Sequence, residues 1–400
     1  MPDSMFRALE TKRLEGSPGG PLSGSAVDMR PVNIALVSTY PPTKCGVGRF
    51  AQSLRTAWSG IAPNAHIEVA RILAEPEPYS SSPDVTVVFD PISPTARRTA
   101  AARINQSEVA VIQHEFGLYG PNDGEAVVDL VARIAIPVVS VLHTVLERPS
   151  RSQIQIVRAL ASRGQIVVPT EGARGRLAEI YQVDEAISTV IPHGSWWSPS
   201  PLPEPPRRRV ITWGLLGPGK GIERCLRAFA KLSLEPAATL RIVGQTHPKV
   251  LAHSGHAYRQ YLEELVSELG LDDRVTFVDR YVDDAELKAF VDDSHLVVVP
   301  YDNHEQVCSG VLTEAVALGR PVVATAFPHA QELLAAGAGL VVPHTERGLL
   351  KGLRLLLEDD HAYDFATDQA ARLAGPLSWH EVAGRYLELV HSVRREVSVA

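Results

Sequence analysis

The residues best suited to chemistry follow apolar runs of the sequence. Lys220 ends the Gly- and Pro-rich segment GLLGPGK and stands directly before an amphipathic helical pattern. Glycines let a ligand approach the backbone closely, and a helix N-terminus beside a lysine attracts negative charge, so this segment suits a diphosphate. It is not a Walker A loop, because Gly221 rather than Ser or Thr follows the lysine. The alternative is a plain turn with a solvated lysine.

A second candidate is Glu314, in the segment QVCSGVLTEAVALGRP. It lies on an apolar helical pattern that begins after Ser309-Gly310. Burying a carboxylate without a partner is costly, so we expect Glu314 to accept hydrogen bonds from a ligand such as a ribose diol. A carboxylate on the surface is the alternative interpretation.

In the first half of the chain, Gly46 and Gly48 fit the dinucleotide pattern G-x-G-x-x-A. A loop that contains Pro41 and Pro42 separates them from the preceding strand pattern, whereas a dinucleotide site needs the glycine turn directly after the strand. We therefore interpret the segment as a loop that caps the next helix and turns backbone N–H groups toward a ligand. A simple tight turn is the alternative.

Polar side chains also follow buried strand patterns in the first half. His114 and Glu115 follow VAVIQ, His143 follows VVSVL, and His193 precedes a proline-rich segment. Ligands of parallel sheets bind at the carboxyl ends of the strands, so these residues are candidates, with structural histidines as the alternative for His114 and His143. The three histidines lack the short spacing of common zinc sites, and no metal is expected.

These residues are positioned by two runs of alternating strand and helix patterns. Apolar strand segments are expected at 33–38, 85–89, 109–113, 137–142 and 165–168, and again at 210–214, 240–243, 275–278, 296–300, 321–324 and 339–342. Segments that are apolar throughout are typical of strands buried on both faces of a parallel sheet. The pattern predicts an α/β protein with two doubly wound Rossmann-like domains that face a central cleft.

The domain boundaries follow from changes in composition. We expect a flexible tail over 1–30, an N-terminal domain over 31–197, a Pro-rich linker over 198–209, a C-terminal domain over 210–375 and a final helix over 376–400 that packs back on the first domain. The linker carries five prolines and cannot be a helix or a central strand.

Composition narrows the class of protein. Hydrophobic residues make up 45% and charged residues 21% of the 400 residues, and the net charge of −7 includes no basic block, which argues against nucleic-acid binding. Three scattered cysteines argue against a disulfide framework. The sequence has no apolar run of spanning length and no secretory segment at its start, so a cytoplasmic protein is expected.

Several segments of the chain, among them those that carry Lys220 and Glu314, resemble the retaining nucleotide-sugar glycosyltransferases of the GT-B fold, the "group 1" family (glycosyltransferase family four). The segments that resemble it are GLLGPGKGI (214–222), LRIVGQTHP (240–248), VTFVDRYVDDAELKAF (275–290), QVCSGVLTEAVALGRPVVAT (306–325), FPHAQELLAAGAGLVVP (327–343) and, in the first half, YPPTKCGVGRFAQSL (40–54), VLHTV (141–145) and IPHG (191–194).

The resemblance implies a role for each candidate residue. Glu314 would bind the nucleotide ribose, Lys220 the diphosphate and His143 the transferred sugar. The remaining implied roles are donor-phosphate contacts by Gly46 and Gly48, base contacts in the loop of Arg280 and Tyr281, leaving-group contacts at the helix start Ser309, Gly310 and Val311, and an acceptor side formed by His114, Glu115 and His193.

Two positions depart from the family pattern. Gln306 replaces the glutamate that contacts the donor sugar, and Leu215 replaces an arginine that often accompanies the diphosphate-binding lysine. The implied activity is the metal- and cofactor-independent transfer of a hexosyl group, with retention, to a hydroxyl acceptor in a glycan, glycolipid or small molecule. Asp283 and Asp284 are expected to be surface carboxylates. Peripheral contact with a membrane is compatible with this activity.

Two other functions remain open. A nucleotide-sugar epimerase or glycosyl phosphorylase would keep the fold and change the chemistry. A glycosyltransferase-like binding subunit with little or no activity is the non-enzymatic alternative, and the residues at 215 and 306 favour it.

Overall fold

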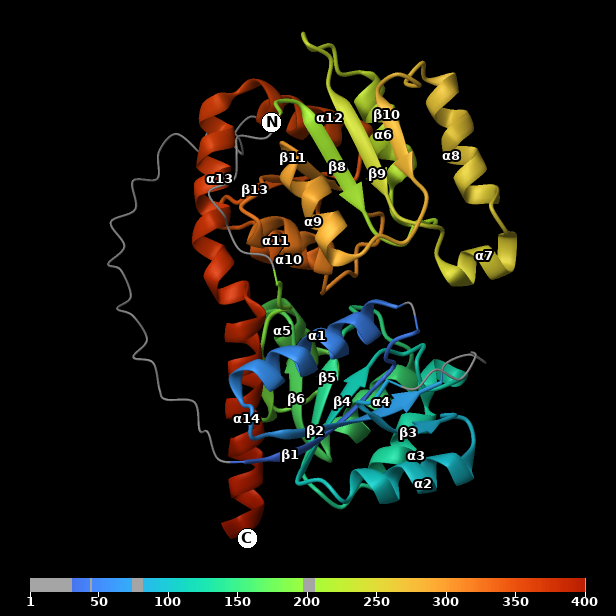
Figure 1. Cartoon of the computed structure of the whole chain (residues 1–400), viewed down its shortest axis with the longest axis vertical. Helices are drawn as coiled ribbons and strands as arrows, with labels where there is room; N and C mark the ends of the chain where they lie inside the picture. The colour runs from blue at the N-terminus through green and yellow to red at the C-terminus, as the bar shows by residue number, and fades with distance from the viewer. Residues whose placement is uncertain (1–30, 44, 74–81, 197–205, 400) are drawn as a thin grey trace.

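The computed structural model describes residues 31–43, 45–73, 82–196 and 206–399. The expected tail over 1–30 and most of the expected linker lie outside these residues. The described chain forms two parallel sheets, each with helices on both faces (Figure 1).

The first sheet has seven strands within the described residues, in the order β3-β2-β1-β4-β5-β6-β7. Its strands are β1 (Asn33–Ser38), β2 (His66–Ile72), β3 (Val85–Phe89), β4 (Val109–His114), β5 (Val138–Leu142), β6 (Gly164–Val168) and β7 (Ser188–Val190). The connecting helices are α1 (Gly46–Ile61), α2 (Pro94–Ile104), α3 (Ala126–Ala132), α4 (Arg151–Ala161) and α5 (Glu171–Glu179).

The second sheet has six strands within the described residues, in the order β10-β9-β8-β11-β12-β13. Its strands are β8 (Arg209–Trp213), β9 (Thr239–Val243), β10 (Val275–Val278), β11 (Leu296–Val299), β12 (Val322–Thr325) and β13 (Gly339–Val342). The helices are α6 (Ile222–Ala230), α7 (Pro248–Ser254), α8 (Ala257–Glu268), α9 (Asp284–Asp292), α10 (Gly310–Ala317), α11 (Pro328–Leu333), α12 (Glu346–Glu358), α13 (Asp360–Ala374) and α14 (Trp379–Val399).

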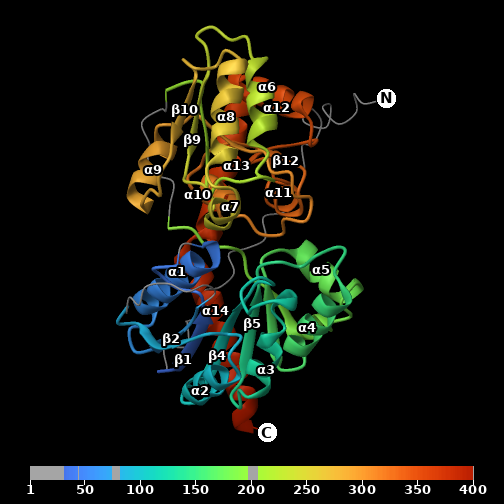
Figure 2. The same cartoon turned by 90° about the vertical axis from the view of Figure 1, so that its right-hand side faces the viewer.

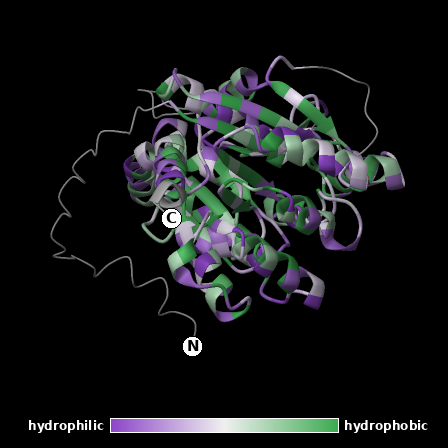
Figure 3. Cartoon of the chain, turned by 90° about the horizontal axis from the view of Figure 1, so that it is seen from below, coloured by the Kyte–Doolittle hydropathy of each residue, from purple (hydrophilic) through white to green (hydrophobic). Residues whose placement is uncertain are grey.

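The strands are buried on both faces, as their uniformly apolar sequences predict. In β1, Ile34 and Leu36 pack with α1 and α14, while Ala35 and Val37 point to the opposite face and join the core beneath α2–α5. This division follows from the two-residue period of a strand. Figure 3 shows that the strands inside the molecule are mainly hydrophobic, whereas the helices carry both kinds of residue.

In both sheets the strand order is that of a Rossmann domain: the first strand is central, and the fourth strand in chain order lies beside it on the other side. The prediction of two doubly wound α/β domains is confirmed. The strand β2 was not among the segments expected from the sequence. In β2 (HIEVARI) charged residues interrupt the apolar run, and Arg71 is buried in the sheet, where its Nη2 donates to Thr43 Oγ1.

The last helix, α14, packs on the first domain although it follows the second domain in the chain (Figures 1 and 2). It lies against α1, and the Trp58 indole N–H donates a hydrogen bond to the carbonyl oxygen of Ala383. Leu387 and Val390 complete the same core. The first domain therefore consists of residues from both ends of the described chain.

Candidate functional site

The strand order places one ligand-binding edge in each domain. The direction in which successive strands are added reverses between β1 and β4 in the first sheet and between β8 and β11 in the second. The crevice at the carboxyl ends of the strands beside such a reversal is the usual ligand site. His114 ends β4 and Glu115 follows it, and the loop that carries Lys220 follows β8. The fold thus brings the predicted residues of each domain to the appropriate edge.

The loop that carries Lys220 lies tightly against the end of β11. Gly221 precedes α6 with a φ of +67°, and a Cβ at this position would stand 1.9 Å from the carbonyl oxygen of Pro300. Glycine is therefore required here. The Lys220 Nζ lies 4.3 Å from the centroid of the Tyr301 ring, so the cation is held beside the N-terminus of α6.

The N-terminus of α10 is capped within the second domain. Ser309 Oγ accepts a hydrogen bond from the Leu312 N–H at 3.2 Å, and the Ser309 N–H donates to His329 Nδ1 at 2.9 Å. Gly310 and Val311 form the first turn. The backbone at this helix start is therefore held by a buried histidine that sequence reasoning missed.

Gln306 lies in the loop before α10, and its carboxamide is used within that loop. Its Nε2 donates to the carbonyl oxygen of Cys308, and its Oε1 accepts from Asn303 Nδ2 at 3.3 Å. The side chain is half-buried. These contacts orient the amide without a charged partner.

Glu314 lies on α10 and is only 9% exposed. Its Oε2 accepts from the Trp213 indole N–H at 3.2 Å, and its Oε1 pairs with Arg49 Nη2 at 2.9 Å. Burial raises the pKa of Glu314, and the charge of Arg49 and the bond from Trp213 act against that rise. The expected buried carboxylate thus meets two donors of this chain, one of them from the other domain.

Arg49 is a site residue that the sequence interpretation missed. It lies in the first turn of α1 and pairs with Asp284 of α9 at 2.6 Å as well as with Glu314. Asp284 is a surface carboxylate, as expected, with a side chain that is 51% exposed, and it also holds an arginine of the opposite domain. The signal for Arg49 was its place directly after the glycines of the α1 loop.

The glycines at the start of α1 are capped by Cys45. Its Sγ accepts from the Gly48 N–H at 3.2 Å and lies 3.0 Å from Thr39 Oγ1. A Cβ at Gly48 would lie 3.4 Å from both Thr39 and Cys45, so the segment is close-packed. Gly46 begins the helix, and a Cβ there would have no neighbour within 4 Å.

Two aromatic contacts place His143 and His193 against the ring of Phe50. Its ring lies 4.9 Å from that of His143 and 5.1 Å from that of His193, in edge-to-face geometry. His143 Nε2 donates to Gln113 Oε1 at 2.8 Å, and burial lowers the pKa of His143 to about 3, which keeps the ring neutral. A Cβ on Gly310 of the second domain would lie 3.3 Å from His193 Nε2, so His193 contacts the start of α10.

His114 and Glu115 differ in their surroundings. His114 is fully buried between Phe116 and Tyr119, and neither ring nitrogen has a hydrogen-bond partner among the described residues. Glu115 accepts from Thr144 Oγ1 at 2.6 Å, and burial raises its pKa. Burial, and in addition the charge of Glu115, raises the pKa of the Cys308 thiol in the second domain, so Glu115 faces the other domain.

Comparison with known proteins bears on the second domain most directly. Residues 198–373 match the family model "Glycosyl transferases group 1". The second domain thus resembles the group 1 glycosyl transferases, and it is called the group 1 domain below. The match includes Lys220, Gln306 and Glu314. A search of curated proteins found no match to the sequence.

Solved structures resemble the whole fold. A sucrose-phosphate synthase from Thermosynechococcus elongatus is 20% identical over 92% of this chain and 100% of its own, with a TM-score of 0.70. Anabaena HepE, in complex with UDP and glucose, is 17% identical over 90% and 100%, with a TM-score of 0.70. A UDP-forming trehalose-phosphate synthase from Burkholderia xenovorans is 13% identical over 92% and 99%, with a TM-score of 0.65. The first domain and the group 1 domain together thus form a GT-B fold.

Arg280 and Tyr281, expected to lie in a loop that contacts a nucleotide base, stand between β10 and α9 of the group 1 domain. The Arg280 guanidinium pairs with Glu286 of α9, and the backbone N–H of Arg280 donates to the carbonyl oxygen of Val278 at 3.0 Å. Tyr281 is 49% exposed. The Arg280 side chain is therefore held by α9, whereas the Tyr281 side chain is exposed.

Two further carboxylates of the group 1 domain, Glu305 and Glu332, bond to the first domain. Glu305 accepts from the Glu147 N–H at 2.6 Å and from Arg176 Nη1 at 3.2 Å. Glu332 accepts from the first two N–H groups of α5, those of Glu171 and Gly172, at 2.8 and 3.0 Å. A carboxylate at a helix N-terminus is favourable, so these bonds hold the two domains together.

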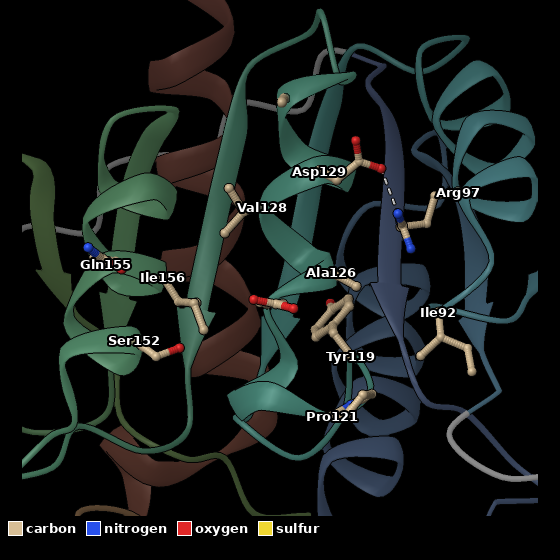
Figure 4. A pocket seen from close by; sticks show the side chains of 12 residues that line it. Ile92, Arg97, Tyr119, Pro121, Ala126, Val128, Asp129, Ser152, Gln155 and Ile156 are labelled. Carbon is tan, nitrogen blue, oxygen red and sulfur yellow. Dashed lines mark hydrogen bonds and ion pairs between the residues drawn. The ribbon is translucent and has the colours of Figure 1, made fainter.

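Other features of the described residues bear on the functional interpretation. No group of three or more His, Cys, Asp and Glu side chains there could hold a metal ion, and no helix is both long and apolar enough to span a membrane. A hollow of about 700 Å³ lies among α2, α3 and α4 (Figure 4). Arg97 and Asp129 form an ion pair on its wall, but none of the predicted site residues lines it.

The buried His114 predicts a loss of stability in acid. Burial lowers its pKa to about 4 from 6.5, so below about pH 6.5 the unfolded chain binds a proton that the folded protein excludes. The contribution of neutral His114 to the free energy of unfolding is therefore fully present above the pKa of the unfolded chain. It is lost as the pH falls toward the pKa of the folded protein. By about pH 5 the loss from His114 reaches roughly 2 kcal/mol.

Urea unfolding at about pH 7.5 and about pH 5 measures this loss. His114→Phe keeps a ring between Phe116 and Tyr119 and removes the titrating group, so the acid loss should shrink by roughly 2 kcal/mol. The same acid loss in both proteins would show that His114 does not contribute.

Proposed function

We propose that this protein is a retaining glycosyltransferase that moves a hexosyl group from a nucleoside-diphosphate sugar to a hydroxyl acceptor without a metal ion. The observation that carries the proposal is Glu314: a buried carboxylate of the group 1 domain lies where α10 meets the first domain. A buried carboxylate is retained where it binds a donor-rich ligand, and a ribose diol supplies two hydroxyl donors.

Lys220 supports a diphosphate beside that ribose. The cation stands over Tyr301 at the start of α6, where the helix dipole and the ammonium group attract the same anion. In the proposed reaction the bond between the anomeric carbon and the diphosphate oxygen breaks, and that oxygen leaves with the electron pair. Lys220 and the backbone N–H groups near Ser309 stabilise the developing negative charge.

The acceptor hydroxyl attacks the anomeric carbon from the face that the diphosphate leaves. Its proton passes to the departing phosphate oxygen, so no base of the protein is needed. His143 donates from Nε2 to Gln113, which leaves its Nδ1 to accept a hydrogen bond from the sugar. Glu115 and His193 line the acceptor side. Closed domains exclude water, which would otherwise hydrolyse the donor.

Gln306 and Leu215 are neutral residues at two positions where the family pattern has charged ones, and the proposed reaction does not need a charge at either. The Gln306 amide is neutral and already oriented by Cys308 and Asn303, so its part would be to position sugar hydroxyls rather than to stabilise charge. Leu215 supplies no cation, and the diphosphate would rest on Lys220, α6 and α10. UDP is the first nucleotide to consider, because UDP is bound in solved structures of HepE and of S. aureus TarM.

A thermal-shift panel of UDP, GDP, ADP and TDP, with and without Mg²⁺, tests the donor site. A nucleotide present at about 100 times its dissociation constant adds roughly 2.7 kcal/mol to the free energy of unfolding, which raises the melting temperature by several degrees. We expect one nucleotide to give the largest shift, and we expect Mg²⁺ to leave that shift unchanged.

The sugar form of that nucleotide then serves as donor, and NMR of the product shows whether the anomeric configuration is retained. Inversion of configuration would contradict the retaining mechanism. Failure of all four nucleotides to shift a folded sample would favour a binding subunit without donor chemistry.

A further inference from the structure

Arg49 joins the two domains at the carboxylate that carries the proposed function. It belongs to α1 of the first domain, and its guanidinium pairs with Glu314 Oε1 at 2.9 Å and with Asp284 Oδ1 at 2.6 Å, both in the group 1 domain. Its side chain is 34% exposed, whereas that of Glu314 is 12% exposed. Arg49 is therefore a reachable cation whose partner is a buried anion.

Glu314 can bind a ribose diol well only as a carboxylate. Ionised, it offers about four lone-pair sites on two oxygens, and Trp213 and Arg49 use one site on each oxygen. Each oxygen then has a lone pair left for a hydroxyl donor. A protonated carboxyl would lose part of this accepting capacity and would present an O–H group to hydroxyls that are themselves donors.

Two groups around Glu314 oppose its protonation, and Arg49 is the charged one of the two. Burial raises the pKa of the carboxyl group, and the negative charge of Asp284 on α9 adds to the rise, while Arg49 on α1 and the indole of Trp213 on β8 oppose it. Tyr281, in the loop before α9, and His193, after β7, both face Arg49, and burial keeps His193 neutral. Among these groups, Arg49 supplies the positive charge.

We propose that Arg49 is a positioning residue: it keeps the Glu314 carboxylate charged and aimed for the donor ribose, and it does so from the first domain, so that ribose recognition depends on contact between the domains. This inference rests on the proposed donor site and adds a residue that the group 1 match, which begins at residue 198, does not include.

The ionisation of Glu314 can be read from Trp213 without any nucleotide. The Trp213 indole N–H donates to Glu314, so its NMR signal in protein with ¹⁵N-labelled tryptophan should titrate with the carboxyl group. Trp213→Phe identifies the signal. We expect the midpoint to rise by at least about one pH unit in Arg49→Met, and to stay within about half a unit of the parent in Arg49→Lys, which keeps the charge.

Binding of ribose tests the consequence. UDP, GDP and ADP are each compared with their 2′-deoxy forms by calorimetry at about pH 7. We expect the parent to bind the ribonucleotide more tightly than its 2′-deoxy form. In Arg49→Met this ratio of affinities should fall at least about fivefold and should recover as the pH rises. In Arg49→Lys most of the ratio should remain. The dispersed signals of the other tryptophans report that each variant is folded.

The outcomes separate the two proposals. A parent that binds a nucleoside diphosphate, with the same Trp213 midpoint and the same ribose preference in Arg49→Met, would overturn the role of Arg49 alone. A folded parent that binds none of the three nucleotides would overturn the donor site, and the role of Arg49 with it.

Discussion

Replacing Lys220 by alanine should reduce the rate of glycosyl transfer by about 100-fold or more, chiefly through kcat. Lys220 stands over the Tyr301 ring at the start of α6, where the proposed diphosphate leaves with its negative charge. A cation placed in advance stabilises the transition state more than the bound donor, in which the charge has not yet developed. Initial rates over a range of donor concentrations separate kcat from KM.

Lys231→Ala is the matched control for that experiment. Lys231 lies at the end of the same helix, is exposed, and pairs with Glu346 rather than with the site. Its removal should leave the rate within about twofold of the parent, because an exposed ion pair contributes little. Retention of activity within tenfold of the parent in Lys220→Ala would rule out the proposed diphosphate role.

Replacing Trp379 by alanine should destabilise the protein by about 3–5 kcal/mol. Trp379 begins α14, is 3% exposed, and its ring lies 5.0 Å from that of Phe50. Its backbone N–H also donates to the Ser195 carbonyl oxygen at 2.9 Å. A Cβ at Gly194 would lie 2.4 Å from the indole, so the ring fills the space beside the chain where it leaves the first domain.

Urea unfolding followed by circular dichroism measures this loss. Trp379→Phe keeps an aromatic ring in the same space and should cost clearly less than the alanine variant. Phe365→Ala is the surface comparison, since Phe365 is 46% exposed. A cost for Trp379→Ala below about 1 kcal/mol would mean that α14 is not held to the first domain by this residue.

The fold was largely predictable because parallel strands buried on both faces have a simple sequence signature. Segments such as VAVIQ and PVVSVL contain little except apolar residues, and each became a strand. β2 escaped because Glu68 and Arg71 break its apolar run, and their partners, Arg103 and Thr43, lie elsewhere in the chain. A charge that is neutralised by tertiary contacts looks like a solvated charge in the sequence.

The site was predictable within each domain but not between the domains. Lys220 and Glu314 were identified from the glycines and apolar residues next to them, and the structure places both at the expected edges of the group 1 domain. Their roles stay predictions. The pairing of Arg49 with Glu314 depends on how two separate sheets face each other, and no local periodicity records that relation.

The position of α14 has a consequence for synthesis of the chain. One face of the first sheet, formed by residues such as Val111 and Val139, is covered by α1 and by a helix that is translated only after the whole group 1 domain. At about 5–20 residues per second, the ribosome needs on the order of ten seconds or more to reach it. During that interval the apolar residues of the first domain that α14 covers in the finished protein lack their partners from that helix.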